Sequence, residues 1–220
     1  LASTRHLAVA DEDLFPQNTA ALGGVKLYGE ERNRAVSYAA TLAVQAGGNL
    51  GRIFGDICRS ERISFQGMEH FHIHEDGGLS GVIRGETVLV GPPAFLRHKA
   101  VRLPGSMPSK TCVCLAVDGE LTAVFIMKYT PNDTVEYALR SLRRSGLQIT
   151  LATRDSNVGL KLLKERFGIS GNVQYPELGE RLTLSDPERD AEEPSALLYR
   201  EGILQLASLM IGSGRLCQTA

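Results

Sequence analysis

A β-hairpin followed by a helix, a strand and a second helix is the most constraining feature of this sequence, and it spans residues 111–169. Two apolar, β-branched runs, 112–117 and 121–127, flank the dipeptide Asp118-Gly119. Asp-Gly between two such runs is a strong signal for a two-residue hairpin turn, because both positions readily adopt positive φ. The segment therefore predicts a pair of antiparallel strands.

A helix–strand–loop–helix unit follows the hairpin. Pro131 suits the first turn of a helix, and apolar residues recur on one of its faces at Val135, Ala138, Leu139 and Leu142. A buried-type strand, 147–152, then leads through the polar turn 153–156 into a helix that ends near residue 168. This order is typical of parallel α/β sheets, in which loops at the carboxyl ends of strands bind ligands.

The remaining chain predicts shorter elements on both sides of this unit. Periodicity and turn residues indicate a strand at 7–10, an extended segment at 20–28, helices at 33–46 and around 53–58, strands within 62–90 around a glycine turn, a short helix at 94–98 and a helical segment at 196–210.

Composition excludes several classes of protein. The 24 basic and 25 acidic residues are almost balanced, so nothing predicts binding to nucleic acid or to an anionic membrane surface. Four cysteines without a regular framework indicate reduced thiols in a cytosolic compartment. No apolar run approaches the roughly 18 residues of a membrane span. Because the chain begins at Leu1 rather than Met, we expect it to be part of a longer protein.

The order of these segments resembles the cytosolic region of P-type ATPases, and most of all the heavy-metal-transporting branch. The segment 81–91, the hairpin 112–127, Pro131 and Gly168-Ile169 match that family in register, within a resemblance that covers most of residues 14–169. It implies an α/β fold: a Rossmann-like (haloacid-dehalogenase-like) parallel-sheet core with an inserted α/β nucleotide-binding domain built on an antiparallel sheet. The implied boundaries are 1–25 and 128–195 for the core, 26–127 for the inserted domain and 196–220 for a C-terminal helical segment.

Departures from the family pattern fall on the residues that carry chemistry. The family's phosphorylated Phe-Asp-Lys-Thr-Gly-Thr motif matches the segment 15–19, which puts Pro16 at the aspartate and Gln17 at the lysine. Proline has no carboxylate to phosphorylate. Thr153 and Asp155 match the family's Thr-Gly-Asp-Asn motif as vestiges, and its later metal-binding Gly-Asp-Gly-x-Asn-Asp segment has no counterpart. The resemblance therefore predicts no catalytic residue and an incomplete Mg²⁺ site.

The family's nucleotide-binding motifs are partly kept. In its glycine turn Gly78 and Gly81 match, Asp76 stands at the first glycine position, and Gly91 closes the matching segment. Asn49 lies where the family has a Ser-Glu-His-Pro helix start. Two interpretations stay open: these residues retain weak ATP binding, or the glycines only shape a hairpin.

Two further groups could bind a metal. His70, His72 and His74 alternate, so on a regular strand they would share one face and could bind zinc or copper. The alternative is an exposed polar strand face, and we assign no metal site. Cys112 and Cys114 also share a face, where buried packing is the expected role.

A rival interpretation is a magnesium-dependent phosphatase of the haloacid-dehalogenase-like class. The strand at 7–10 precedes Asp11-Glu-Asp13, which resembles that class's Asp-x-Asp motif. Asp11 would be the nucleophile and Asp13 the general acid and base. The supporting residues would be Thr153 for the phosphoryl oxygen, Lys161 or Lys164 for charge neutralisation, and Asp186 with Asp190 for Mg²⁺.

The resemblance and the departures together predict a function. We expect a P-type-ATPase-like pseudoenzyme: the cytosolic domain of a membrane protein that has lost the phosphorylation site and serves as a regulatory or binding module with at most weak ATP binding. An active relative would couple ATP hydrolysis to metal cation transport. The expected partners are the membrane-embedded remainder of its own chain or another protein, and a nucleotide but no nucleic acid. The expected location is the cytoplasmic side of a membrane.

Overall fold

The computed structural model describes residues 6–109, 111–186 and 202–218, with side chains as far as residue 212 in the last helix. Contacts divide the chain into two compact units. Unit 1 comprises residues 1–16, 130–153 and 158–220, and unit 2 comprises residues 17–129 and 154–157. In the described part no helix is long and apolar enough to cross a membrane. The division into a core and an inserted domain at 25/26 and 127/128 stays a prediction.

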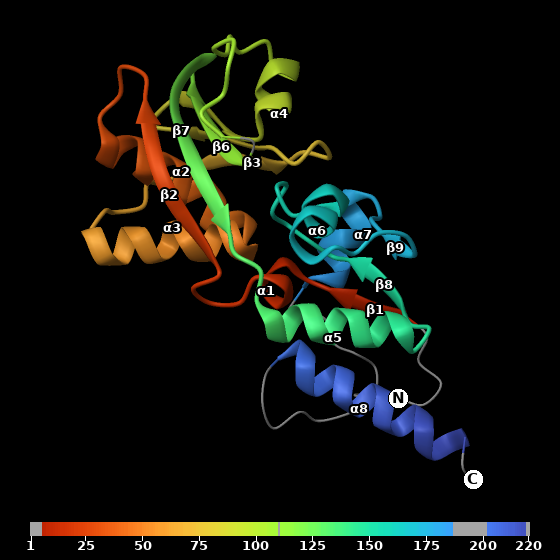
Figure 1. The fold of residues 1–220 in the computed structure, drawn as a ribbon. Helices are drawn as coiled ribbons and strands as arrows, with labels where there is room; N and C mark the ends of the chain where they lie inside the picture. Colours follow the sequence, from red (N-terminus) through yellow and green to blue (C-terminus); the bar gives the residue numbers. More distant parts are fainter. Residues whose placement is uncertain (1–5, 110, 187–201, 219–220) are drawn as a thin grey trace. The chain divides into compact units, whose positions relative to one another are not determined.

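Unit 1 is built on a three-stranded parallel sheet in the order β1-β8-β9 (Figure 1). The strands are β1 (His6–Val9), β8 (Gln148–Leu151) and β9 (Val173–Gln174). Its helices are α1 (Asp11–Leu14), α5 (Asp133–Arg144), α6 (Leu160–Phe167), α7 (Leu178–Leu184) and α8 (Ile203–Gln218). Helix α5 covers one side of the sheet and α6 the other, while α8 packs along α5.

Helix α5 begins later than its proline suggests. Asn132 is the N-cap, and its Oδ1 accepts hydrogen bonds from the backbone N–H groups of Thr134 at 2.9 Å and Val135 at 3.4 Å. Pro131 therefore lies before the helix and not in its first turn. The predicted apolar face is confirmed, since its four residues are buried: Val135, Ala138, Leu139 and Leu142.

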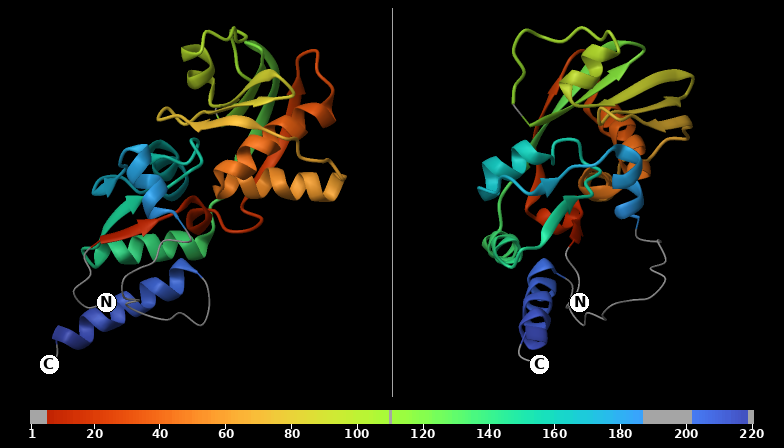
Figure 2. Two further views of the ribbon diagram at one scale, coloured as in Figure 1. Left: turned by 180° about the vertical axis from the view of Figure 1, so that it is seen from behind. Right: turned by 90° about the vertical axis from the view of Figure 1, so that its right-hand side faces the viewer.

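Unit 2 is built on a six-stranded antiparallel sheet in the order β2-β7-β6-β5-β4-β3. The strands are β2 (Ala20–Leu27), β3 (Glu69–Ile73), β4 (Leu79–Ile83), β5 (Glu86–Gly91), β6 (Cys112–Val117) and β7 (Glu120–Tyr129). The helices are α2 (Arg32–Ala46), α3 (Gly48–Glu61) and α4 (Pro93–His98). Figure 2 shows α2 and α3 together on this sheet.

The predicted hairpin is confirmed as β6 and β7. Asp118 has φ 49° and Gly119 has φ 83°, as a turn with two left-handed residues requires. Every residue of β6 is buried, because α4 covers one face of the sheet and α2 with α3 cover the other. Cys112 and Cys114 are free thiols that pack against α4 with Phe95.

The three histidines do not form the regular row that the sequence suggests. His70 has φ 53°, and the register of β3 against β4 shifts between Glu69 and His72, so the strand is irregular where alternation was expected. His72 and His74 do lie together, with ring centroids 4.7 Å apart. The prediction that the three imidazoles share one strand face is therefore wrong, because the positive φ of His70 turns the strand at that residue.

Candidate functional site

The carboxyl edge of the parallel sheet in unit 1 brings Asp11 and Thr153 to neighbouring strand ends. The backbone N–H of Ala152 donates to the carbonyl of Val9 at 2.9 Å, so the chain segments after β1 and β8 leave the same edge side by side. Both Asp11 and Thr153 have 0% exposure. Buried polar residues at this edge are typical of ligand sites in parallel sheets.

Asp11 and Pro16, the two positions that compete for the phosphorylated aspartate, lie in different places in unit 1. Asp11 follows β1, whereas Pro16 lies beyond α1 and outside the sheet edge. Asp11, and not Pro16, is therefore the residue that follows a strand of the parallel sheet. Phe15, on which the sequence match relied, is buried against Phe167 with ring centroids 5.4 Å apart.

Asp13 is held at the start of α1, and burial raises its pKa, with a smaller contribution from the charge of Asp11. Its carboxylate accepts a hydrogen bond from the backbone N–H of Ala10 at 2.9 Å, which closes the first turn of α1. Thr153 is also engaged locally, because its hydroxyl donates to the carbonyl of Val158 at 2.7 Å. Both side chains thus hold the loops at the sheet edge in place.

A buried cation, Arg181, lies next to Thr153 and was missed in the sequence. Its Nη1 donates to the carbonyl of Thr153 at 2.9 Å and its Nε to that of Pro176 at 3.0 Å, and the residue is 3% exposed. Its guanidinium also lies over the ring of Tyr175, 4.5 Å from the centroid. No sequence signal marks it, since the segment after residue 169 has no clear period. Arg181 could not be predicted because only the folded structure shows that its guanidinium is buried.

The lysines and aspartates predicted to support the phosphatase site are not found together at this sheet edge. Lys161 and Lys164 are exposed on α6, Asp186 is exposed, and Asp190 lies outside the described residues. Across the described ranges, no group of three His, Cys, Asp or Glu side chains is placed to hold a metal ion.

Asp155 holds a turn. Its Oδ1 accepts from the backbone N–H of Asn157 at 2.9 Å, and its Oδ2 accepts from the hydroxyl of Tyr129 at the end of β7. The residue is 1% exposed. Both carboxylate oxygens therefore have partners, as in an Asx-turn.

The glycines of the predicted nucleotide turn surround an aromatic ring. A Cβ built on Gly78 would lie 2.2 Å from the ring of Phe95, and one built on Gly91 would lie 2.7 Å from that ring and 2.9 Å from the Cα of Gly78. Phe95 is fully buried. Glycine at both positions is thus explained by the close approach of this ring. Gly81 is separate, since its Cβ would meet the sulfur of Met68.

Asp76 and Asn49 have partners of their own. The carboxylate of Asp76 lies 3.1 Å from Nδ1 of His98, on an exposed part of the turn. Asn49 is fully buried near the start of α3, where its Oδ1 accepts from Arg52 at 2.7 Å.

His74 connects the histidine pair to the glycine turn. Its Nε2 lies 2.8 Å from the hydroxyl of Ser80, and its ring centroid lies 5.1 Å from that of Phe95. Burial lowers the pKa of His74, and the charges of Lys99 and His72 add to this effect. The imidazole is therefore biased toward its neutral form.

Unit 1 is a parallel-sheet core with a buried carboxylate and a buried threonine at its carboxyl edge, and unit 2 is an antiparallel sheet covered by helices. An α/β chain of this kind, with the second sheet entering directly after the first parallel strand, confirms the fold class predicted from the sequence.

Comparison with known proteins identifies its relatives. No family model matches the chain. The silver-exporting P-type ATPase of Salmonella typhimurium is 23% identical over 139 residues, which cover 59% of this chain and 17% of that protein. The copper-transporting ATPase 2 of Rhizobium meliloti (strain 1021) is 22% identical over 149 residues, which cover 64% and 18%. The chain thus spans less than a fifth of either relative.

Among solved structures, the catalytic domain of the CPx-ATPase CopB-B, described in a study of conformational changes upon nucleotide binding, shares the fold. The TM-score is 0.51 at 14% identity, and the match covers 80% of this chain and 61% of that one. The sequence relatives of this chain are heavy-metal P-type ATPases, and its fold is that of the catalytic domain of such an enzyme. The resemblance predicted from the sequence is confirmed.

Proposed function

We propose that this chain is the cytosolic module of a P-type-ATPase-like membrane protein that keeps the fold of the catalytic region without its phosphoryl-transfer cycle. In this proposal unit 1 corresponds to the phosphorylation core and unit 2 to the inserted nucleotide-binding domain. The module lies on the cytoplasmic side of a membrane, and its partner is the membrane-embedded remainder of the same protein or another protein. Its role is regulatory or binding rather than catalytic.

The observation that carries the proposal is the residue after Asp11. In the family motif a lysine follows the phosphorylated aspartate, and here Glu12 takes that place. A carboxylate beside an incoming phosphate repels it, where a lysine would stabilise the developing charge. The next positions are also altered, since Leu14 and Phe15 are buried apolar residues at the end of α1 instead of the motif's small and hydroxyl residues.

The same reasoning supports weak ATP binding at most. Phe95 fills the space beside Gly78 and Gly91, and Asp76 adds a negative charge to the turn that would face a phosphate. Asn49 is already bonded within α3. The proposed remains of a nucleotide site are Gly78, Gly81, Asp76, Gly91 and Asn49.

Calorimetric titration of the 220-residue chain with ATP, with and without Mg²⁺, tests the proposal. We expect a Kd of about 1 mM or weaker, which corresponds to no more than about 4 kcal/mol of binding free energy. Asp76→Gly restores the family's glycine and removes the charge, so it should strengthen binding, while the neighbouring Glu75→Gln should not. Micromolar binding by the unaltered chain would contradict the weak-site proposal.

A second candidate function is the phosphatase with Asp11 as nucleophile. Asp11 and Thr153 follow adjacent parallel strands, and Arg181 contributes a buried positive charge beside Thr153. Hydrolysis of para-nitrophenyl phosphate in the presence of Mg²⁺ tests it. Phosphatase activity that Asp11→Asn abolishes would favour this candidate. Equal rates of hydrolysis by the unaltered chain and the Asp11→Asn variant would exclude it.

A further inference from the structure

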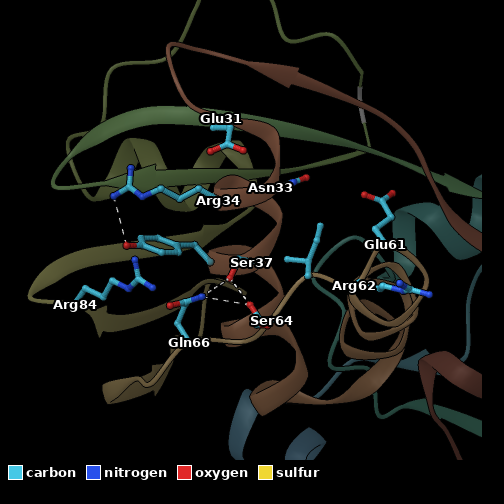
Figure 3. A pocket seen from close by; sticks show the side chains of 11 residues that line it. Glu31, Asn33, Arg34, Ser37, Glu61, Arg62, Ser64, Gln66 and Arg84 are labelled. Carbon is cyan, nitrogen blue, oxygen red and sulfur yellow. Dashed lines mark hydrogen bonds between the residues drawn. The ribbon is translucent and has the colours of Figure 1, made fainter.

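A pocket in unit 2 is lined by none of the residues discussed above as site candidates. Its volume is about 360 Å³, within the range of small-molecule sites. Three segments form it: the start of α2, the connection from α3 to β3, and the turn between β4 and β5 (Figure 3). These segments are distant in the sequence, so the pocket is a product of the fold.

One wall of the pocket is held rigid by a hydrogen-bond network. The hydroxyl of Ser37 donates to the carbonyl of Ser64 at 2.6 Å, and Nε2 of Gln66 donates to the Ser37 hydroxyl at 3.0 Å and to the Ser64 carbonyl at 3.3 Å. The backbone N–H of Gln66 also donates to Thr41 at 3.0 Å. The Oε1 atom of Gln66 accepts no hydrogen bond from any described residue, so it is available as an acceptor.

Arg34 on the same wall is already neutralised. Its Nη2 lies 2.6 Å from both carboxylate oxygens of Glu86, and its Nη1 pairs with Glu30. The hydroxyl of Tyr38 donates to Glu86 at 2.6 Å and helps to hold this cluster. Arg34 therefore shapes the pocket without offering an unpaired charge.

Arg84 also contributes a positive charge to the pocket, and this charge helps to lower the pKa of Glu86. Within the described part of the chain Arg84 forms no hydrogen bond or ion pair, and it has φ 52° in the turn before Gly85. A left-handed position of this kind favours glycine or asparagine, so an arginine there adds local strain. Figure 3 places Arg84 on the same side of the pocket as Gln66, whereas Arg62 lies with Glu61 on the opposite side.

We propose that this pocket binds a small organic oxyanion, with a carboxylate or phosphate group held by the guanidinium of Arg84. The planar fork of arginine matches both groups. Gln66 would accept a hydrogen bond from a hydroxyl or amine of the same ligand. Among the charged lining residues Arg34 and Glu61 are already paired with neighbours, which leaves Arg62 and Arg84 against Glu31, so an anion fits the pocket better than a cation. The inference does not rest on the proposed function, because it concerns a different surface.

Calorimetric titration of the full chain with inorganic phosphate, pyrophosphate and citrate, each separately, tests the proposal. We expect at least one of them to bind. Arg84→Gly should weaken that binding about tenfold or more, because it removes the charged fork. The same change should keep or raise the thermal unfolding midpoint, since glycine tolerates positive φ. A loss of binding in this variant therefore cannot be attributed to unfolding.

Arg102→Gly is the control for the loss of one positive charge. Arg102 is an exposed arginine of unit 2, outside its helices and strands, and it does not line the pocket. We expect this variant to bind within about threefold of the unaltered chain, because salt screens exposed charges that lie away from the pocket. A response to phosphate or pyrophosphate alone assigns a phosphoryl ligand, and a response to citrate alone assigns a carboxylate. Absence of binding by all three anions, or equal loss in both variants, overturns the proposal.

Discussion

At the scale of single residues, the positions of Gly78 and Gly91 are explained by packing against Phe95 more directly than by ligand binding. Gly78 and Gly91 meet at one side of Phe95, and neither has room for a side chain. A phosphate cradle needs open backbone N–H groups, whereas this turn encloses a buried ring. The two interpretations left open by the sequence therefore differ in what a methyl group at Gly78 should do.

Gly78→Ala should destabilise the fold by about 1–3 kcal/mol, because the new Cβ would overpack against the Phe95 ring. Urea unfolding measures this free energy. Gly105→Ala is the control, since a Cβ there has nothing within 4 Å. If the two alanine variants were equally stable, the packing role of Gly78 would be wrong.

His74 should make stability depend on pH. Burial lowers its pKa in the folded chain, while the unfolded chain titrates near the ordinary value of about 6.5. The unfolded state therefore binds more protons as the pH falls below neutrality, and the stability contributed by neutral His74 is lost toward its lowered folded pKa.

His74→Gln keeps a donor for Ser80 and removes this titration. We expect the loss of unfolding free energy between about pH 7.5 and about pH 5.5 to be smaller in the variant than in the unaltered chain. Urea unfolding at both pH values gives the difference. An identical pH dependence would show that His74 does not titrate differently in the two states.

At the scale of elements, the start of α5 illustrates how far local sequence rules reach. Asn132→Ala should cost about 1 kcal/mol, because two backbone N–H groups lose their acceptor at the helix start. Asn132→Asp keeps the acceptor and should stay within about 0.5 kcal/mol of the unaltered chain. Chemical denaturation of both variants checks this, and an alanine variant as stable as the parent would contradict the cap.

The hairpin and the buried face of α5 could be predicted because their signals are local: a turn dipeptide and a helical period. The strand that delivers a carboxylate could not be assigned so reliably. Two segments compete for that role in the sequence, and only the pairing of β1 with β8 shows that Asp11, and not Pro16, follows a strand of the parallel sheet. A pairing between residues so distant in the chain leaves no local signal.

At the scale of the whole molecule, the features that could not be predicted from the sequence are those assembled from separate segments. Arg181 becomes notable only through its burial beside Thr153. The pocket of unit 2 forms only when α2, the α3–β3 connection and the turn at Arg84 are brought together. The class of fold, in contrast, follows from the order of elements along the chain, and the P-type ATPase relatives agree with it.

The central claim is that the fold of the catalytic region persists while phosphoryl transfer is lost, and trapping of a phosphoenzyme tests it most directly. The chain and its Asp11→Asn variant are incubated with ATP labelled on the γ-phosphate, with Mg²⁺, and quenched in acid. We predict the same background label in both, because Glu12 opposes the incoming phosphate. Hydroxylamine-sensitive label that appears in the unaltered chain and disappears in Asp11→Asn would contradict the account.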